Sequence, residues 1–98
     1  MDKIKCDILL IRMIKGYNLV FHHPQTVETL SFGDGKIFLH LKSLGIIASG
    51  HSLNEAHQVL CDSIAEDYHY FVVNPPPKLS SKETEYARQL KMLVGKFY

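Results

Sequence analysis

The sequence predicts an α+β protein in which an antiparallel-rich sheet of about three to five strands carries a long amphipathic helix on one face. Residues 1–50 are β-rich in composition and alternation, whereas residues 52–73 place apolar side chains at spacings of three and four. A Pro-rich corner at 74–80 then separates this helix from a C-terminal helix over 81–97. Strands that precede helices in this order favour helices packed on one face of the sheet.

The size and composition of the chain predict one soluble domain over residues 1–98. A chain of 98 residues buries enough surface for an ordinary core, and 46% hydrophobic with 21% charged residues exclude a disordered chain. The net charge of +1 gives no indication of a partner held mainly through phosphate contacts. The N-terminal apolar run is too short for a signal sequence or a membrane span, so we expect a cytoplasmic location and no membrane partner.

The first strand is predicted from Lys3 to Arg12. Its alternation of apolar with charged residues indicates one face on the core, with Ile8 and Leu10 in the core-facing phase. Leu9 and Ile11 interrupt the polar phase, so part of the second face is also expected to be covered.

The second strand forms a hairpin with the first. Lys15-Gly16 supplies the turn, and the residues from Tyr17 to His22 return to a β-type composition. His23-Pro24-Gln25 is expected to end this strand, because proline cannot donate a hydrogen bond to a ladder.

A second hairpin follows over residues 29–41. Its connection is Gly33-Asp34-Gly35, which combines conformationally permissive glycines with a turn-forming aspartate. Residues 42–45 then lead into a short apolar strand at 46–49, which is bounded by glycines and feeds the long helix.

The long helix is predicted to begin at a capping box. Ser52 is followed three residues later by Glu55, so the Ser hydroxyl can accept from the Glu55 amide while the Glu carboxylate reaches back to the Ser52 amide. The apolar stripe of the helix consists of Ala56, Val59, Leu60, Ile64, Tyr68, Phe71 and Val72.

The C-terminal helix repeats this pattern after three consecutive prolines. Ser80 and Glu83 have capping-box spacing. The second apolar stripe consists of Tyr86, Ala87, Leu90, Leu93, Val94 and Phe97.

The residue pattern predicts no catalytic, cofactor-binding or metal-binding site. No two of the six histidines are four residues apart, which is the spacing that zinc sites on helices favour. Cys6 and Cys61 lie in apolar surroundings without a metal-like or redox-like spacing, so we interpret them as reduced, packed thiols. We therefore expect no enzyme and no cofactor. The histidines are His22, His23, His40, His51, His57 and His69.

Two alternatives remain open. Asp7 with Asp62 or Glu66 could form a divalent-metal nuclease centre, although a row of acidic residues along a helix is usually a solvated face. Strand aromatics with nearby lysines could instead stack and hold nucleic acid, although aromatic residues on strands more often fill a core. The aromatic residues of this second alternative are Tyr17, Phe21, Phe32 and Phe38.

The junction between sheet and helix resembles the HicB-like antitoxin family. A Gly-x-Ser/Thr-x-x-Glu-Ala segment links the sheet to the helix in that family, and Gly50, Ser52, Glu55 and Ala56 match it here. The likeness extends to residues 67–70 and 78–81 and so covers about the second half of the chain.

The resemblance implies a partial RNase-H-like sheet, no catalytic activity, and a role in blocking a small RNA-cleaving toxin. It also implies self-association into dimers or larger homo-oligomers. No helix-turn-helix or ribbon-helix-helix segment follows the domain in this sequence, so operator binding is not expected from such an appendage. We predict a partner-binding surface that includes Tyr17, Phe21, Phe38 and Leu44.

Overall fold

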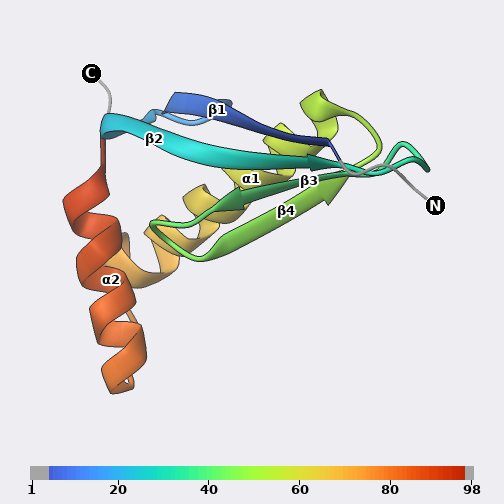
Figure 1. The fold of residues 1–98 in the computed structure, drawn as a ribbon. Coiled ribbons are helices and arrows are strands. Elements are labelled where there is room, and N and C mark those ends of the chain that lie inside the picture. The colour runs from blue at the N-terminus through green and yellow to red at the C-terminus, as the bar shows by residue number, and fades with distance from the viewer. Residues whose placement is uncertain (1–4, 97–98) are drawn as a thin grey trace.

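The sheet and its long helix form the predicted α+β fold. The computed structural model describes the backbone of residues 5–96 and the side chains from residue 7 onward. Four strands follow the order β1-β2-β3-β4 with every neighbouring pair antiparallel, and helix α1 crosses one face of this sheet (Figure 1). The strand bounds are β1 Lys5–Ile14, β2 Leu19–Ser31, β3 Ile37–Leu41 and β4 Ile46–Gly50.

The long helix has the predicted extent but two geometries. Helix α1 covers Leu53–Tyr68 and continues without a break into a π-helical turn, η1, over His69–Val73. The amide of Asn74 donates to the carbonyl of His69 at 2.9 Å, which closes this wider turn. The helix therefore ends where the proline run begins, as the sequence predicts.

The cap of α1 matches the prediction in one of its two hydrogen bonds. The amide of Glu55 donates to Oγ of Ser52 at 3.1 Å. The Glu55 carboxylate, however, accepts from the amide of His51 at 3.4 Å and not from the amide of Ser52. The prediction of the reciprocal hydrogen bond is therefore wrong by one residue, since the donor is the amide before Ser52.

The cap of α1 gives a first testable prediction. Replacing Ser52 with Ala removes the acceptor for the Glu55 amide, so the free energy of unfolding should fall by about 0.5–2 kcal/mol. Ser81→Ala, at an exposed position in the first turn of the second helix, should stay within about 0.5 kcal/mol of the parent protein. Urea unfolding of the two variants measures the difference, and equal midpoints would contradict the cap.

The strand β2 is longer than the sequence predicts. It passes through Pro24 instead of ending there, so that prediction is wrong. On one side, β2 pairs with β1, whose register shifts between Ile11 and Met13 at this point. On the other side β2 pairs with β3 only from Glu28 onward. Pro24 therefore lies in a stretch without ladder partners, where its missing amide hydrogen costs no bond.

The C-terminal helix is shorter than predicted. Helix α2 covers Ser81–Leu93, and its predicted capping box between Ser80 and Glu83 is present with both hydrogen bonds. The chain then forms a short strand β5, Val94–Lys96, which pairs with β2 at Leu19 to Phe21. The prediction of a helix is wrong at Val94–Lys96, and Phe97 lies outside the described residues.

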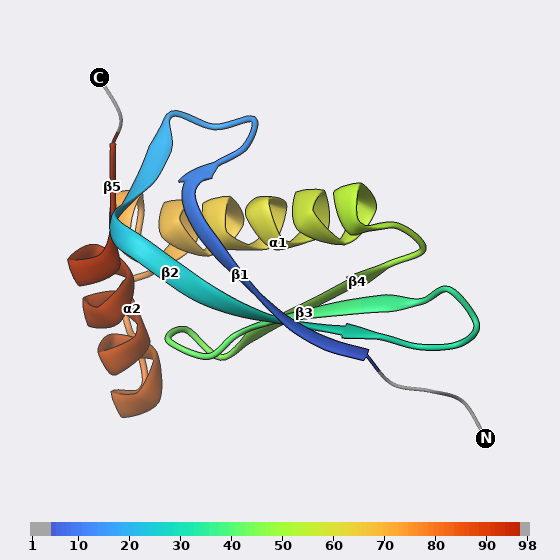
Figure 2. The ribbon, with the colours of Figure 1, turned by 45° about the horizontal axis from the view of Figure 1, so that its top comes forward.

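The core lies between the sheet and α1. Figure 2 shows α1 along one face of the sheet and α2 at its end, with β5 beside β2. Along β1, Ile11 is buried and Leu9 half-buried, whereas Ile8 and Leu10 are 66% and 70% exposed. The predicted phase of this strand is therefore reversed. Leu9 lies opposite the buried Val27, so pairing with β2 turns Leu9 and Ile11 toward the helix.

Candidate functional site

The face of the sheet opposite α1 carries a group of apolar side chains without a covering element among the described residues. Side chains alternate between the two faces of a strand, so residues one position away from the core residues point to this second face. We call this surface the open sheet face, and its apolar members are Ile8, Leu10, Leu30, Phe38 and Ile47.

One row of the ladder shows how the open sheet face is composed. Ile8 lies opposite Glu28, Glu28 opposite His40, and His40 opposite Ile47. Glu28 forms an ion pair with Lys42 at 2.9 Å, and Nδ1 of His40 lies 3.7 Å from the same carboxylate. The row therefore has a charged centre between two isoleucines, of which Ile47 is 64% exposed.

The open sheet face continues onto a free strand edge. Within the described residues β1 pairs only with β2, so one side of this ten-residue strand has no ladder partner. The same strand carries the exposed Ile8 and Leu10, and Met13 is also exposed. An unpaired edge with apolar side chains is a template for pairing with another chain. The exposed apolar side chains therefore lie on the strand whose outer edge has no ladder partner in the described part of the chain.

The four residues predicted to bind a partner do not lie on one surface of the structure. Phe21 is fully buried and Leu44 nearly so, and both belong to the core. Phe38 is half-buried on the open sheet face, where its ring meets Phe32 edge-on with centroids 5.3 Å apart. Tyr17 is exposed in the turn between β1 and β2. Of the four, Phe38 alone belongs to the open sheet face.

Tyr17 is held at the helix surface by a small polar network. Its hydroxyl donates to Oδ1 of Asp62 at 2.8 Å, and Nε2 of Gln58 donates to the same oxygen at 3.0 Å. These hydrogen bonds, first from Gln58 and then from Tyr17, lower the pKa of Asp62. The hydrogen bond to the carboxylate is also the main reason that the pKa of Tyr17 is raised. The network fastens the β1-β2 turn to α1.

The candidate chemical groups do not assemble into a metal or nucleophile site in the part of the chain that the structure describes. No three His, Cys, Asp or Glu residues of that part could hold a metal ion together. Asp62 instead accepts the two hydrogen bonds from Tyr17 and Gln58. Cys61 is a free, buried thiol whose pKa is raised by burial, and its Sγ lies 3.7 Å from Nε2 of His57. The side chain of Cys6 lies outside the described residues.

One of the four aromatic residues that could stack on nucleic-acid bases lies in the core. Phe21 cannot present its ring to a base, because its side chain is fully buried. Phe32 and Phe38 pack on each other, and Nζ of Lys36 lies 5.3 Å from the centroid of the Phe38 ring. Nucleic-acid binding stays a prediction.

The most exposed apolar residues of the open sheet face were missed by the sequence reasoning. The sequence predicts that Ile8 and Leu10 face the core, and it predicts no exposed face for the apolar strand that contains Ile47. Each lies in a run where both phases of the strand are apolar, as in Ile46-Ile47. Alternation cannot then tell which phase faces the helix, and only the pairing register decides it.

Within residues 5–96, no helix is long and apolar enough to cross a membrane. Comparison with protein-family models, with curated protein sequences and with solved structures finds no significant match to this chain.

Proposed function

We propose that this chain is a non-enzymatic, antitoxin-like protein that binds a small RNA-cleaving toxin through the open sheet face and the free edge of β1. The observation that carries the proposal is the exposure of Ile8 and Leu10 on a strand whose outer edge has no ladder partner between residues 5 and 96. The strand-to-helix junction at Gly50, Ser52, Glu55 and Ala56, which resembles that of HicB-like antitoxins, names the class of partner.

The chemistry of the surface favours a protein partner. Contiguous exposed apolar side chains mark protein interaction sites more often than nucleic-acid sites, which are basic. A partner strand could pair with the β1 edge through backbone hydrogen bonds, while its side chains pack on Ile8 and Leu10. The Glu28 and Lys42 ion pair at the centre of the face would contribute more to the orientation of this partner than to the affinity.

A second copy of this chain is the competing occupant of the same edge. Pairing of β1 with β1 of another copy would give the homo-oligomer that the family resemblance implies, and it would cover the same apolar side chains. Toxin binding and self-association through β1 would then compete. Light scattering of the purified protein, alone and with the toxin, separates the two complexes by mass.

The proposal is tested by co-expression with the products of neighbouring genes, followed by pull-down. We expect capture of a small toxin and loss of its RNA-cleaving activity in the complex. Leu10→Glu should weaken this binding at least about tenfold, because a carboxylate would be buried without a partner in the interface. The absence of any stable small partner would contradict the proposed function.

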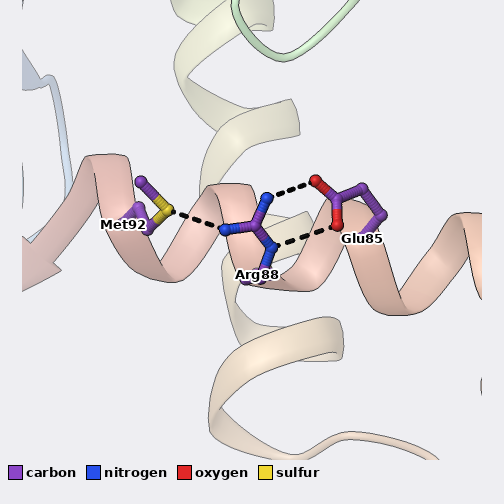
Figure 3. A network of polar contacts seen from close by, with 3 residues as sticks. All are labelled: Glu85, Arg88 and Met92. Carbon is purple, nitrogen blue, oxygen red and sulfur yellow. Dashed lines mark hydrogen bonds and ion pairs between the residues drawn. The ribbon is translucent and has the colours of Figure 1, made fainter.

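Met92→Glu provides a matched control for Leu10→Glu. Met92 is 61% exposed on α2, away from the open sheet face. Figure 3 shows it beside Arg88, which also holds Glu85 and would stand next to the introduced carboxylate. Toxin binding should be unchanged in this variant, and both variants should lose less than about 1 kcal/mol of stability. Equal weakening by the two substitutions would exclude the open sheet face as the interface.

A further inference from the structure

A cavity of about 970 Å³ lies at the end of α1 that is remote from the capped junction. Its walls come from the β1-β2 turn at residues 17–19, from residues 65–70 of α1 and η1, and from Val73 and Lys96. None of these residues belongs to the open sheet face. The volume is at the upper end of that found for small-molecule sites.

The β1-β2 turn, which forms one wall of the cavity, is held in place by hydrogen bonds to α1. Tyr17 is held by its hydroxyl on Asp62, and Nε2 of Gln58 donates to the carbonyl of Lys15 at 3.3 Å. The turn between these residues passes through Gly16, whose φ of 91° suits glycine. Gln58 also donates to the Asp62 oxygen that accepts from Tyr17, so one connected network fastens the turn to the helix at two points. A pre-organised wall lowers the cost of ordering on binding.

The opposite side of the cavity is shaped by the π-helical turn. A π-helix is wider than an α-helix, and such turns occur frequently at functional sites. The ring of Phe71 meets that of Tyr70, which lines the cavity, and that of Tyr86 on α2, both edge-on with centroids 4.8 and 5.3 Å apart. The Tyr86 hydroxyl donates to Oδ2 of Asp67 at 2.5 Å, which ties the end of α1 just before this turn to α2. The contact between Phe71 and Tyr86 therefore packs the π-helical turn against α2.

The chemistry of the lining favours a positively charged ligand. Tyr17, Tyr68 and Tyr70 contribute aromatic rings, whose faces attract cations. Glu66 and Asp67 contribute two carboxylates, against the single ammonium of Lys96 and the imidazole of His69. Tyr70 is 51% exposed, so its ring is accessible to a ligand. Aromatic rings with an excess of carboxylate suit an organic cation that carries an apolar group.

We infer that this cavity is a binding site for a small organic cation with an apolar or aromatic substituent. The cation lies against the tyrosine rings and near the Glu66 carboxylate, and the substituent fills the apolar part beside Val73. The site is separate from the toxin-binding surface and does not depend on it.

The inference is tested with benzyltrimethylammonium as the probe, against benzenesulfonate and benzyl alcohol as anionic and neutral ligands of similar shape. Chemical-shift titration of the full chain should give shifts centred on residues 17–19 and 65–70. The cation should bind at least about tenfold more tightly than the anion and more tightly than the alcohol. Equal binding of the three ligands, preference for the anion, or shifts centred elsewhere would overturn the inference.

Charge variants test the assignment from both directions. Glu66→Gln should weaken binding of the cation about three- to tenfold, whereas Lys96→Gln should strengthen it about threefold by removing a repulsive charge. Glu85→Gln is the matched control, since Glu85 is exposed on α2 outside the cavity and pairs with Arg88. It should leave the affinity unchanged, as should Leu10→Glu. An equal effect of Glu66→Gln and Glu85→Gln would overturn the inference without bearing on toxin binding.

Discussion

Replacing Phe21 with Ala should lower the free energy of unfolding by about 3–5 kcal/mol. Phe21 is among the largest fully buried side chains of the described residues. It lies opposite Val94 in the ladder between β2 and β5, and Val94 is also buried. Truncation would therefore leave a cavity and also weaken the attachment of the β5 strand that follows α2. Urea unfolding measures this loss, and it is large against the 5–15 kcal/mol of a typical domain.

Phe38→Ala is the control for this result. Phe38 is half-buried on the open sheet face, so its truncation should cost roughly 1–2 kcal/mol. If Phe21→Ala does not fold, Phe21→Leu should still fold and lose about 1 kcal/mol or more. Similar losses for Phe21→Ala and Phe38→Ala would show that Phe21 is not in the core.

Gly50→Ala should destabilise the protein by about 1–3 kcal/mol through crowding at the junction between β4 and α1. A Cβ atom at this position would lie 2.7 Å from the amide nitrogen of Ala56 and 2.9 Å from Cγ of Glu55. The first of these atoms is helix backbone and cannot move alone. The start of α1 would therefore have to shift away from the sheet, and the Ser52 cap with it. Thermal unfolding measures the effect.

Gly95→Ala separates crowding against backbone from crowding against a movable side chain. A Cβ atom at Gly95 would lie 2.6 Å from Cε1 of His22, but His22 is exposed and its ring can rotate away. We expect a loss below about 1 kcal/mol for this variant. If Gly95→Ala costs as much as Gly50→Ala, the close approach of α1 to the end of β4 is not what requires glycine at position 50.

The elements set by local chemistry could be predicted from the sequence. The Ser52 hydroxyl cap, the Ser80 and Glu83 capping box and the proline stop after residue 73 depend on residues within one turn of each other. The hairpin connection is similar, since the amide of Lys36 donates to the Asp34 carboxylate at 3.0 Å. Such patterns can be read from the sequence because their hydrogen bonds do not depend on residues elsewhere in the chain.

Apart from the misplaced Glu55 hydrogen bond at the cap of α1, the errors involve partners that are distant in sequence. Val94 continues the apolar stripe of α2, but pairing with Phe21 draws it into a strand. Gly95 after Leu93 was the available signal that the helix ends there. Pro24 is tolerated because β2 lacks ladder partners at that point, which no local pattern reveals.

The residues of the open sheet face could not be predicted from the sequence either, because strand pairing over long distances determines them. Ile8 and Leu10 are as apolar as Leu9 and Ile11, so sequence alone allowed either pair to face the helix. The pairing of Leu9 with Val27 decides the question. The same register, with its shift between β1 and β2, leaves Phe21 inside the core. Ile8 and Leu10, predicted to face the core, are therefore on the surface, and Phe21, predicted to bind a partner, is in the core. The predicted fold class is unaffected by these differences.

Methyl relaxation by a soluble paramagnetic agent can test whether α1 covers one face of the sheet and leaves the other for a partner. In a dilute, isoleucine-methyl-labelled sample, Ile8 and Ile47 should relax strongly, whereas the fully buried Ile14 and Ile64 should be protected. In the toxin complex, Ile8 and Ile47 should become protected as well. Protection of Ile8 and Ile47 in the free monomer, or unchanged exposure in the complex, would contradict the open sheet face as the binding surface.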